Sequence, residues 1–98
     1  MHIRLSRFAG LDPERIDETL QQFQEQELPN LEQQKGFGGI TVGVNRRSGQ
    51  AVAVALWETE GDMRESEKVA DQARERAVAT AKPERDPVVD HYEVIFQK

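Results

Sequence analysis

The hydrophobic positions of this chain fall into short periodic segments separated by polar ones. The longest apolar run is AVAVALWE at residues 51–58, where small alanines alternate with larger side chains. A run of about eight residues with no regular polar position is typical of a strand covered on both faces. Residues 2–8 alternate as a half-buried strand does, with Ile3 and Leu5 on one face and polar side chains on the other.

Two helices are predicted between the strands. The first begins at Asp12 and Pro13, because aspartate caps free amides and proline suits the first helical position. Pro29 lacks an amide hydrogen, so a kink or break is expected just before it, with the second piece ending near residues 35–36.

The second predicted helix begins at Thr59, which forms a capping-box pattern with Asp62. Its buried stripe consists mostly of small residues, namely Met63, Ser66, Ala70, Ala73, Ala77 and Ala81. Such a helix either lies very close to the sheet or leaves empty volume beneath it.

Two further strands complete the prediction. Residues 38–45 form a glycine-containing strand that turns at 46–49 into the strand 51–58, and residues 88–97 form the last strand. This order predicts an α+β fold of the ferredoxin-like βαββαβ type, an antiparallel four-stranded sheet in the order 4-1-3-2 with two helices on one face. The length predicts a single domain over residues 1–98.

The strand patterns also predict which face of the sheet the helices cover. We expect the bulky face to meet the helices, and its residues are Ile3, Leu5, Tyr92, Val94 and Phe96. The other face has no cover within the chain, so a second copy of the sheet is its natural cover and a homodimer is expected. The expected dimer interface comprises Arg4, Ala53, Ala55, Trp57, His91 and Glu93, with Arg4 and Glu93 as a cross-strand pair.

Composition and charge restrict the classes of partner that the protein can bind. The net charge of −5 repels phosphate backbones and anionic membranes, so no nucleic acid and no membrane is expected as a partner. The absence of cysteine excludes disulfides and thiolate metal sites. No apolar run approaches the roughly 20 residues that span a bilayer, and no signal core follows Met1, so a cytoplasmic location is expected.

The segment LPNLEQQKGFGGITVGVNRRSGQAVAVALWETEGDM resembles the dimeric α/β-barrel superfamily, in particular its antibiotic biosynthesis monooxygenase-like domains. Such domains typically have a proline in the first helix, a Gly-Phe-x-Gly entry into the second strand, a glycine hairpin and a strand ending in Leu-Trp-Glu. The resemblance implies a homodimer whose two sheets close a barrel, with a small-molecule pocket between sheet and helices in each subunit. The superfamily includes cofactor-independent quinone-forming monooxygenases, haem-degrading enzymes, isomerases and many members with no known reaction. The resemblance therefore allows cofactor-independent monooxygenation of an aromatic or quinol-type compound as one expected activity.

Haem and metal chemistry are not expected. Haem-degrading members of the superfamily use an asparagine late in the first strand and a tryptophan and a histidine on the second helix. Arg7, Ser66 and Arg76 stand near those positions here, and none of them matches. His2 and His91 share a face but lack a third ligand at usable spacing.

The candidate catalytic residues are Arg7, Tyr92 and Ser66. Arg7 could bind an anionic ligand or simply reach solvent from the strand end. Tyr92 could donate a hydrogen bond to a phenolate or be an ordinary core tyrosine. We expect the same three residues, with Ala70 and Ala73, to bind the small aromatic ligand in the pocket.

Two function classes therefore fit the sequence. The first is the small monooxygenase-like enzyme. The second is a non-catalytic dimeric protein, with a ligand-binding or stress-related role, in which the alanines let the helix dock closely. A cavity of about 300 Å³ or more between sheet and helices favours the first class, and a filled core favours the second.

Overall fold

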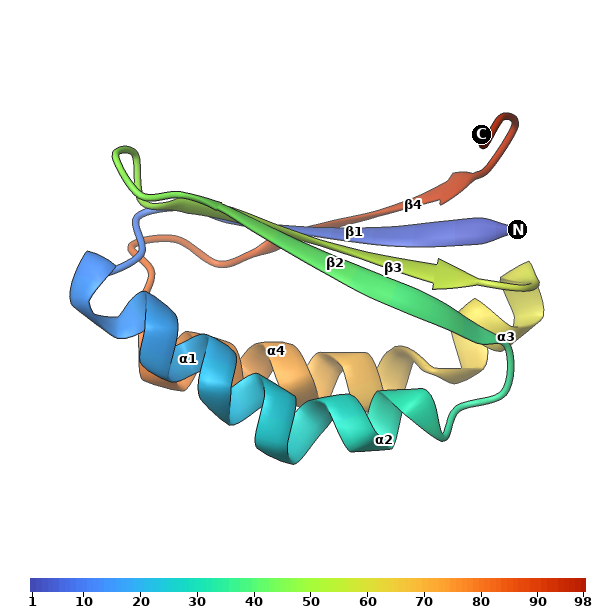
Figure 1. The fold of residues 1–98 in the computed structure, drawn as a ribbon, viewed down its shortest axis with the longest axis horizontal. Helices are drawn as coiled ribbons and strands as arrows, with labels where there is room; N and C mark the ends of the chain where they lie inside the picture. The colour runs from blue at the N-terminus through green and yellow to red at the C-terminus, as the bar shows by residue number, and fades with distance from the viewer.

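The computed structural model describes residues 1–98 as one sheet with every helix on the same side of it (Figure 1). The strands are β1 (His2–Phe8), β2 (Phe37–Asn45), β3 (Gln50–Trp57) and β4 (Val88–Glu93). They lie in the order β2-β3-β1-β4, and each neighbouring pair is antiparallel. The predicted ferredoxin-like fold and strand order are confirmed. The last strand is shorter than predicted, since it ends at Glu93.

The connection from β1 to β2 is a helical segment in four parts. These are the 3₁₀ turn η1 (Pro13–Arg15), α1 (Ile16–Gln22), the π-helical turn η2 (Phe23–Glu27) and α2 (Leu28–Glu32). Asp12 caps the start, because its Oδ1 accepts a hydrogen bond from the Glu14 amide at 3.0 Å. The irregularity expected before Pro29 takes the form of η2, where the Leu28 amide donates to the carbonyl five residues back.

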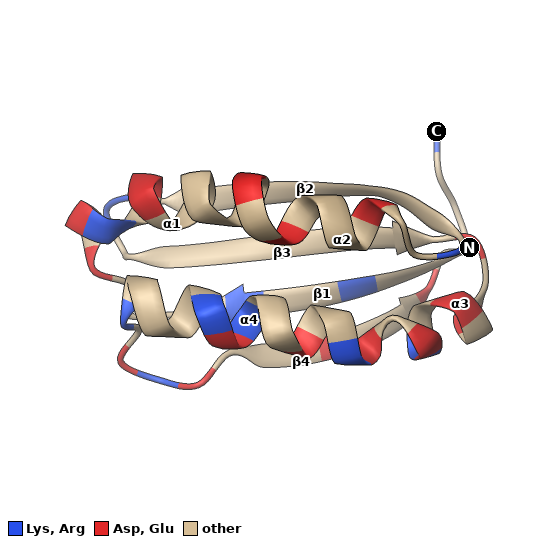
Figure 2. Cartoon of the chain, turned by 90° about the horizontal axis from the view of Figure 1, so that it is seen from below, with Lys and Arg blue, Asp and Glu red and all other residues tan.

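The connection from β3 to β4 contains α3 (Glu60–Glu65) and α4 (Glu67–Ala81), which are divided at Ser66. Thr59 caps α3 as predicted, since its Oγ1 accepts a hydrogen bond from the Asp62 amide at 3.0 Å. Lys82 ends α4 in the left-handed conformation, with φ 49°. Seen from the helix side, α1 and α2 run beside α4, and acidic residues occur on all three helices (Figure 2).

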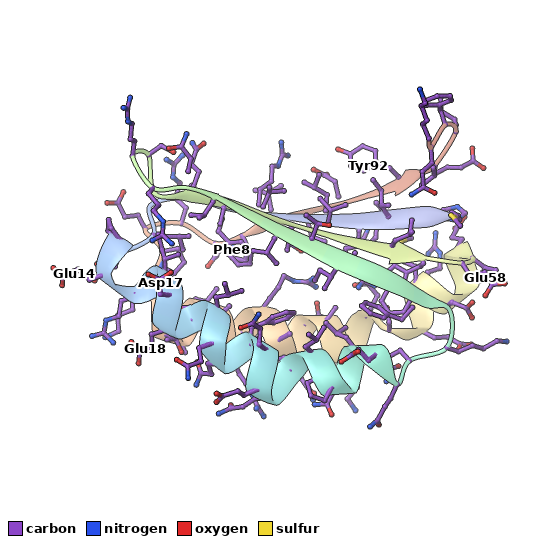
Figure 3. All side chains as sticks on the ribbon, viewed as in Figure 1. Phe8, Glu14, Asp17, Glu18, Glu58 and Tyr92 are labelled. Carbon is purple, nitrogen blue, oxygen red and sulfur yellow. The ribbon has the colours of Figure 1, made fainter.

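The face of the sheet that the helices cover is the opposite of the predicted one. Arg4, Ser6 and Trp57 are buried under the helices, with Trp57 0% exposed. Figure 3 shows Phe8 directed toward the helices and Tyr92 on the other side of the sheet. In the register, Arg4 lies opposite both Ala55 and His91. The residues that share each face are grouped as predicted, so the error lies only in which of the two faces the helices cover.

The predicted dimer interface is consequently wrong. Its six residues lie on the helix-covered face of the same chain: Arg4, Ala53, Ala55, Trp57, His91 and Glu93. Arg4 pairs with Glu67 of α4 rather than with Glu93. The prediction assigned the larger apolar strand residues to the helices. Here the helices themselves supply bulk, because Leu31 and Met63 pack on Ala55 and Trp57.

The core between sheet and helices forms two separate clusters. One contains Leu31, Ala55, Trp57 and Met63, and the other contains Leu11, Ile16 and Ala81. None of the helices is sufficiently long and apolar to cross a membrane. The cytoplasmic location stays a prediction.

Candidate functional site

A cavity of about 180 Å³ lies between the sheet and the helices, bordered by residues of both core clusters. Seven alanines of β3 and α4 line it, namely Ala51, Ala53, Ala55, Ala70, Ala73, Ala77 and Ala81. Protein interiors are normally close-packed, and a strand and a helix that both present methyl groups cannot fill the space between them. The small residues of α4 therefore leave volume beneath the helix.

The rest of the cavity wall is largely apolar. Sixteen of its 23 lining residues are hydrophobic, including Phe8, Phe23 and Ile40, so the cavity suits an apolar ligand body. Its volume is below the roughly 300 Å³ expected of the monooxygenase-like class. An apolar cavity of about 150 Å³ holds a benzene molecule, so this one has room for one substituted ring or two fused rings.

A polar edge interrupts the apolar wall. It consists of Arg4 and Ser6 on β1 and Arg74 on α4, all of which line the cavity. Arg74 is 13% exposed, and its Nη1 donates to the Ser6 Oγ over a long 3.4 Å. Its Nη2 pairs with Asp71. The Arg74 guanidinium and the Ser6 hydroxyl therefore keep donor capacity for an oxygen atom in the cavity.

Arg4 is a fixed charge in this wall. Its Nε and Nη2 donate to Glu67 Oε1 at 3.2 and 3.1 Å, and its Nη2 donates to the Met63 carbonyl at 2.6 Å and to Ser66 Oγ at 2.8 Å. The guanidinium also lies 5.5 Å from the centre of the Trp57 ring. Burial lowers the pKa of Arg4, and the Glu67 carboxylate offsets part of that effect.

An ion pair stands at the hairpin end of the cavity. Asp17 of α1 and Arg46 of the β2–β3 turn both line the cavity, and Arg46 Nη2 donates to Asp17 Oδ1 at 2.8 Å. The hydrogen bond and charge of Arg46 lower the pKa of Asp17. The pair is therefore formed at neutral pH and is lost only as the pH falls through that lowered pKa.

The structure separates the residues that the sequence grouped as a site. Arg7 and Tyr92 lie on the open face of the sheet, outside the cavity, and Arg7 pairs there with Asp90 at 2.8 Å. Their assignment to the pocket is wrong because it followed the inverted face. Ser66 is 0% exposed and does not line the cavity, because its hydroxyl accepts from Arg4 and donates to the Met63 carbonyl.

Two of the predicted residues do line the cavity, Ala70 and Ala73, although their role in ligand binding stays a prediction. Sequence reasoning missed the polar edge of Arg4, Ser6 and Arg74. The spacing carried a signal for it, since Arg74 follows Ala70 by four residues and so borders the small-residue stripe.

No protein-family model matches the sequence, and a search of curated proteins finds no match. Solved structures match in fold. The monooxygenase ActVA-Orf6 of Streptomyces coelicolor, in complex with nanaomycin D, has a TM-score of 0.76 at 14% identity, covering 99% of this chain and 92% of that one. The cofactor-independent oxygenase SnoaB of Streptomyces nogalater has a TM-score of 0.67 at 15% identity, covering 98% and 94%.

A third match is a dimeric ferredoxin-like protein from an uncultured marine organism, with a TM-score of 0.73 at 8% identity, covering 99% of this chain and 90% of that one. At sequence identities this low, the matches establish a shared backbone fold and not a shared active site. The chain has the fold of these oxygenases and of a solved antibiotic biosynthesis monooxygenase.

Proposed function

We propose that the cavity binds a small phenol or quinol and that the protein is a cofactor-independent monooxygenase acting on it. The observation that carries this proposal is the combination of an apolar cavity with a cationic edge, made of the Arg74 guanidinium and the Ser6 hydroxyl beside buried Arg4. A phenolate has the matching shape, because its ring is apolar and its charge sits on one oxygen atom. The monooxygenases of the same fold support the choice of chemistry.

The reaction needs little from the protein beyond binding the phenolate. Donors placed at the phenolate oxygen favour the ionised, electron-rich form of the ring. That ring gives electrons to molecular oxygen at the carbon opposite the phenolate. With 1-naphthol, one oxygen atom enters the ring, the other leaves as water, and the product is 1,4-naphthoquinone. The ring is the only reductant, so no cofactor is required.

Ligand binding without turnover is the second candidate. It is favoured by the small volume of the cavity and by the state of its acidic group, since Asp17 is engaged by Arg46 at the hairpin end. Such a protein would hold the phenol without releasing a quinone.

We also propose that the open face of the sheet joins two copies of the chain. Val88 and Tyr92 are 52% and 47% exposed there, and β1 and β3 add a central apolar strip, formed by Ile3, Leu5, Val52, Val54 and Leu56. An apolar strip across three strands is more than a monomer usually exposes. The dimeric protein of the same fold supports this assembly.

Replacing Ala73 with leucine is expected to abolish ligand binding with little loss of stability, because the added side chain enters existing volume. Differential scanning fluorimetry with 1-naphthol, hydroquinone and benzoate measures binding, and oxygen uptake with 1-naphthol measures turnover. At a hundred times its dissociation constant, a ligand should stabilise the wild type by about 2.7 kcal/mol.

The matched control is Ala79→Leu, which places the same side chain on the exposed side of α4. It should bind and react as the wild type does. Binding without oxygen uptake selects the second candidate. Equal binding by the Ala73→Leu and wild-type proteins would exclude the cavity as the site.

A further inference from the structure

A second hollow, a groove of about 760 Å³, is lined by residues of α3, the start of α4, the start of β1 and the end of β4. It is separate from the cavity, since the two share no lining residue. Its walls are polar and carry both histidines of the chain, together with Glu60, Arg64, Glu67 and Glu93. Apart from Glu67, which pairs with buried Arg4, these side chains are used neither by the proposed monooxygenase activity nor by the core.

His91 and Glu67 form a short hydrogen-bonded pair in this groove. His91 Nε2 lies 2.7 Å from Glu67 Oε1. An ionised carboxylate only accepts hydrogen bonds, so in neutral His91 the Nε2 atom carries the hydrogen and Nδ1 keeps a free lone pair. Arg4 holds the same carboxylate oxygen through Nε and Nη2, which fixes Glu67 and through it the imidazole.

A second pair lies beside the first. His2 Nε2 is 3.6 Å from Glu60 Oε2, and Arg64 holds the other oxygen of that carboxylate at 2.7 Å. His2 lies opposite Glu93 and His91 lies opposite Arg4, so the two imidazoles are diagonal neighbours on one face. In each pair a carboxylate orients a histidine and leaves one ring nitrogen free. This is the arrangement of a general base.

The charges of the groove indicate what it would accept. Three carboxylates and one guanidinium line it, so it repels anions. Carboxylates and free imidazole nitrogens accept hydrogen bonds from hydroxyl groups. A neutral molecule with several hydroxyl groups suits these walls better than a carboxylic acid or a hydrocarbon.

We propose that this groove is a proton-transfer site for a small neutral hydroxycarbonyl compound, with His91 as the general base and Glu67 as its positioning residue. His91 Nδ1 takes the proton from the carbon beside the carbonyl group, and the carbonyl oxygen takes a proton from water to give an enediol. The imidazolium then gives its proton to the former carbonyl carbon. The hydroxyl on the carbon that was first deprotonated releases its proton to water and becomes the new carbonyl group. Aldose and ketose forms interconvert with no other reactant.

The test measures deuterium exchange at the C–H groups of dihydroxyacetone in D₂O. Proton NMR monitors both the loss of the C–H signals and the formation of glyceraldehyde. Wild-type protein should exchange them at least 100-fold faster than equimolar free imidazole. His91→Ala should lose about 100-fold or more of that rate. Added imidazole should restore part of it, which a merely structural role of His91 would not allow.

Glu65→Gln is the matched control, because Glu65 is an exposed glutamate of α3 that does not line the groove. It should exchange at the wild-type rate. His91 is itself 42% exposed on an edge strand, so its replacement leaves the core intact. A wild-type rate no higher than that of imidazole, or a His91→Ala rate equal to that of the wild type, overturns the proposal.

Discussion

The Arg4→Met variant should be less stable than the wild type by about 3 kcal/mol, because the substitution leaves the Glu67 carboxylate without its buried partner. Arg4 is 3% exposed, and it also donates to the Met63 carbonyl and to Ser66 Oγ. Each acceptor that loses its donor in a buried site costs free energy. Glu67 is 33% exposed, so water relieves part of the loss and keeps the figure at the low end for a broken buried pair.

Arg7→Met is the control for that experiment. Arg7 is on the same strand, but it is 57% exposed on the opposite face and pairs with the partly exposed Asp90. In the isolated subunit, where this face is in water, its loss should cost roughly 1 kcal/mol or less. Urea unfolding at equal protein concentration measures both variants, and Arg4→Met combined with Glu67→Met should recover much of the loss. Equal effects of Arg4→Met and Arg7→Met would mean that Arg4 is not the buried anchor described here.

The Val54→Asp variant should separate the proposed dimer, raising its dissociation constant by about 100-fold or more, which is about 2.8 kcal/mol. Val54 lies on the open face of the central strand β3, opposite Leu5 of β1 and Thr41 of β2. A carboxylate placed there would be buried by the second copy without a partner charge. In the isolated subunit the same carboxylate stays in water, so the fold should persist.

Sedimentation velocity at micromolar concentration measures the effect. Gln72→Glu is the control, because it adds one negative charge at an exposed position of α4 on the other side of the molecule. It should sediment as the wild type does. A wild-type protein that sediments as a monomer, or a Val54→Asp protein that sediments as a dimer, would contradict assembly through this face.

The topology could be predicted because local signals agreed with one another. Thr59 and Asp12 cap the helices at the predicted places, and the glycines that weaken β2 coincide with a register shift between Phe37 and Gly39. Each of these features acts over a few residues, so the sequence alone contains it.

The faces of the sheet could not be predicted in the same way. Alternation along β1 separates Ile3 and Leu5 from Arg4 and Ser6, but it does not say which set meets the helices. The answer depends on Glu67 and Ser66, which lie more than 60 residues away along the chain and give Arg4 its buried partners. An arginine in a strand is buried only where such partners exist, and helix packing brings them there.

The sequence predicted the small residues that line one side of the cavity but not the cavity itself. The alanines of α4 left two outcomes open, close docking or empty volume. The alanines of β3 decide between them, because both sets line the same space once the face is assigned correctly. The four-residue spacing from Ala70 places Arg74 beside the alanine stripe, but its contact with Ser6 joins α4 to β1 and depends on the tertiary packing.

The central claim is that the space between the alanine stripes binds an aromatic ring, and a methyl NMR experiment tests it most directly. Protein with ¹³C-labelled alanine methyl groups is titrated with 1-naphthol, and nuclear Overhauser effects between the ring protons and these methyl groups are recorded. We predict effects to Ala53, Ala55 and Ala73, which line the cavity, and none to exposed Ala79. Saturating 1-naphthol that gives no effect to any cavity alanine would contradict the account.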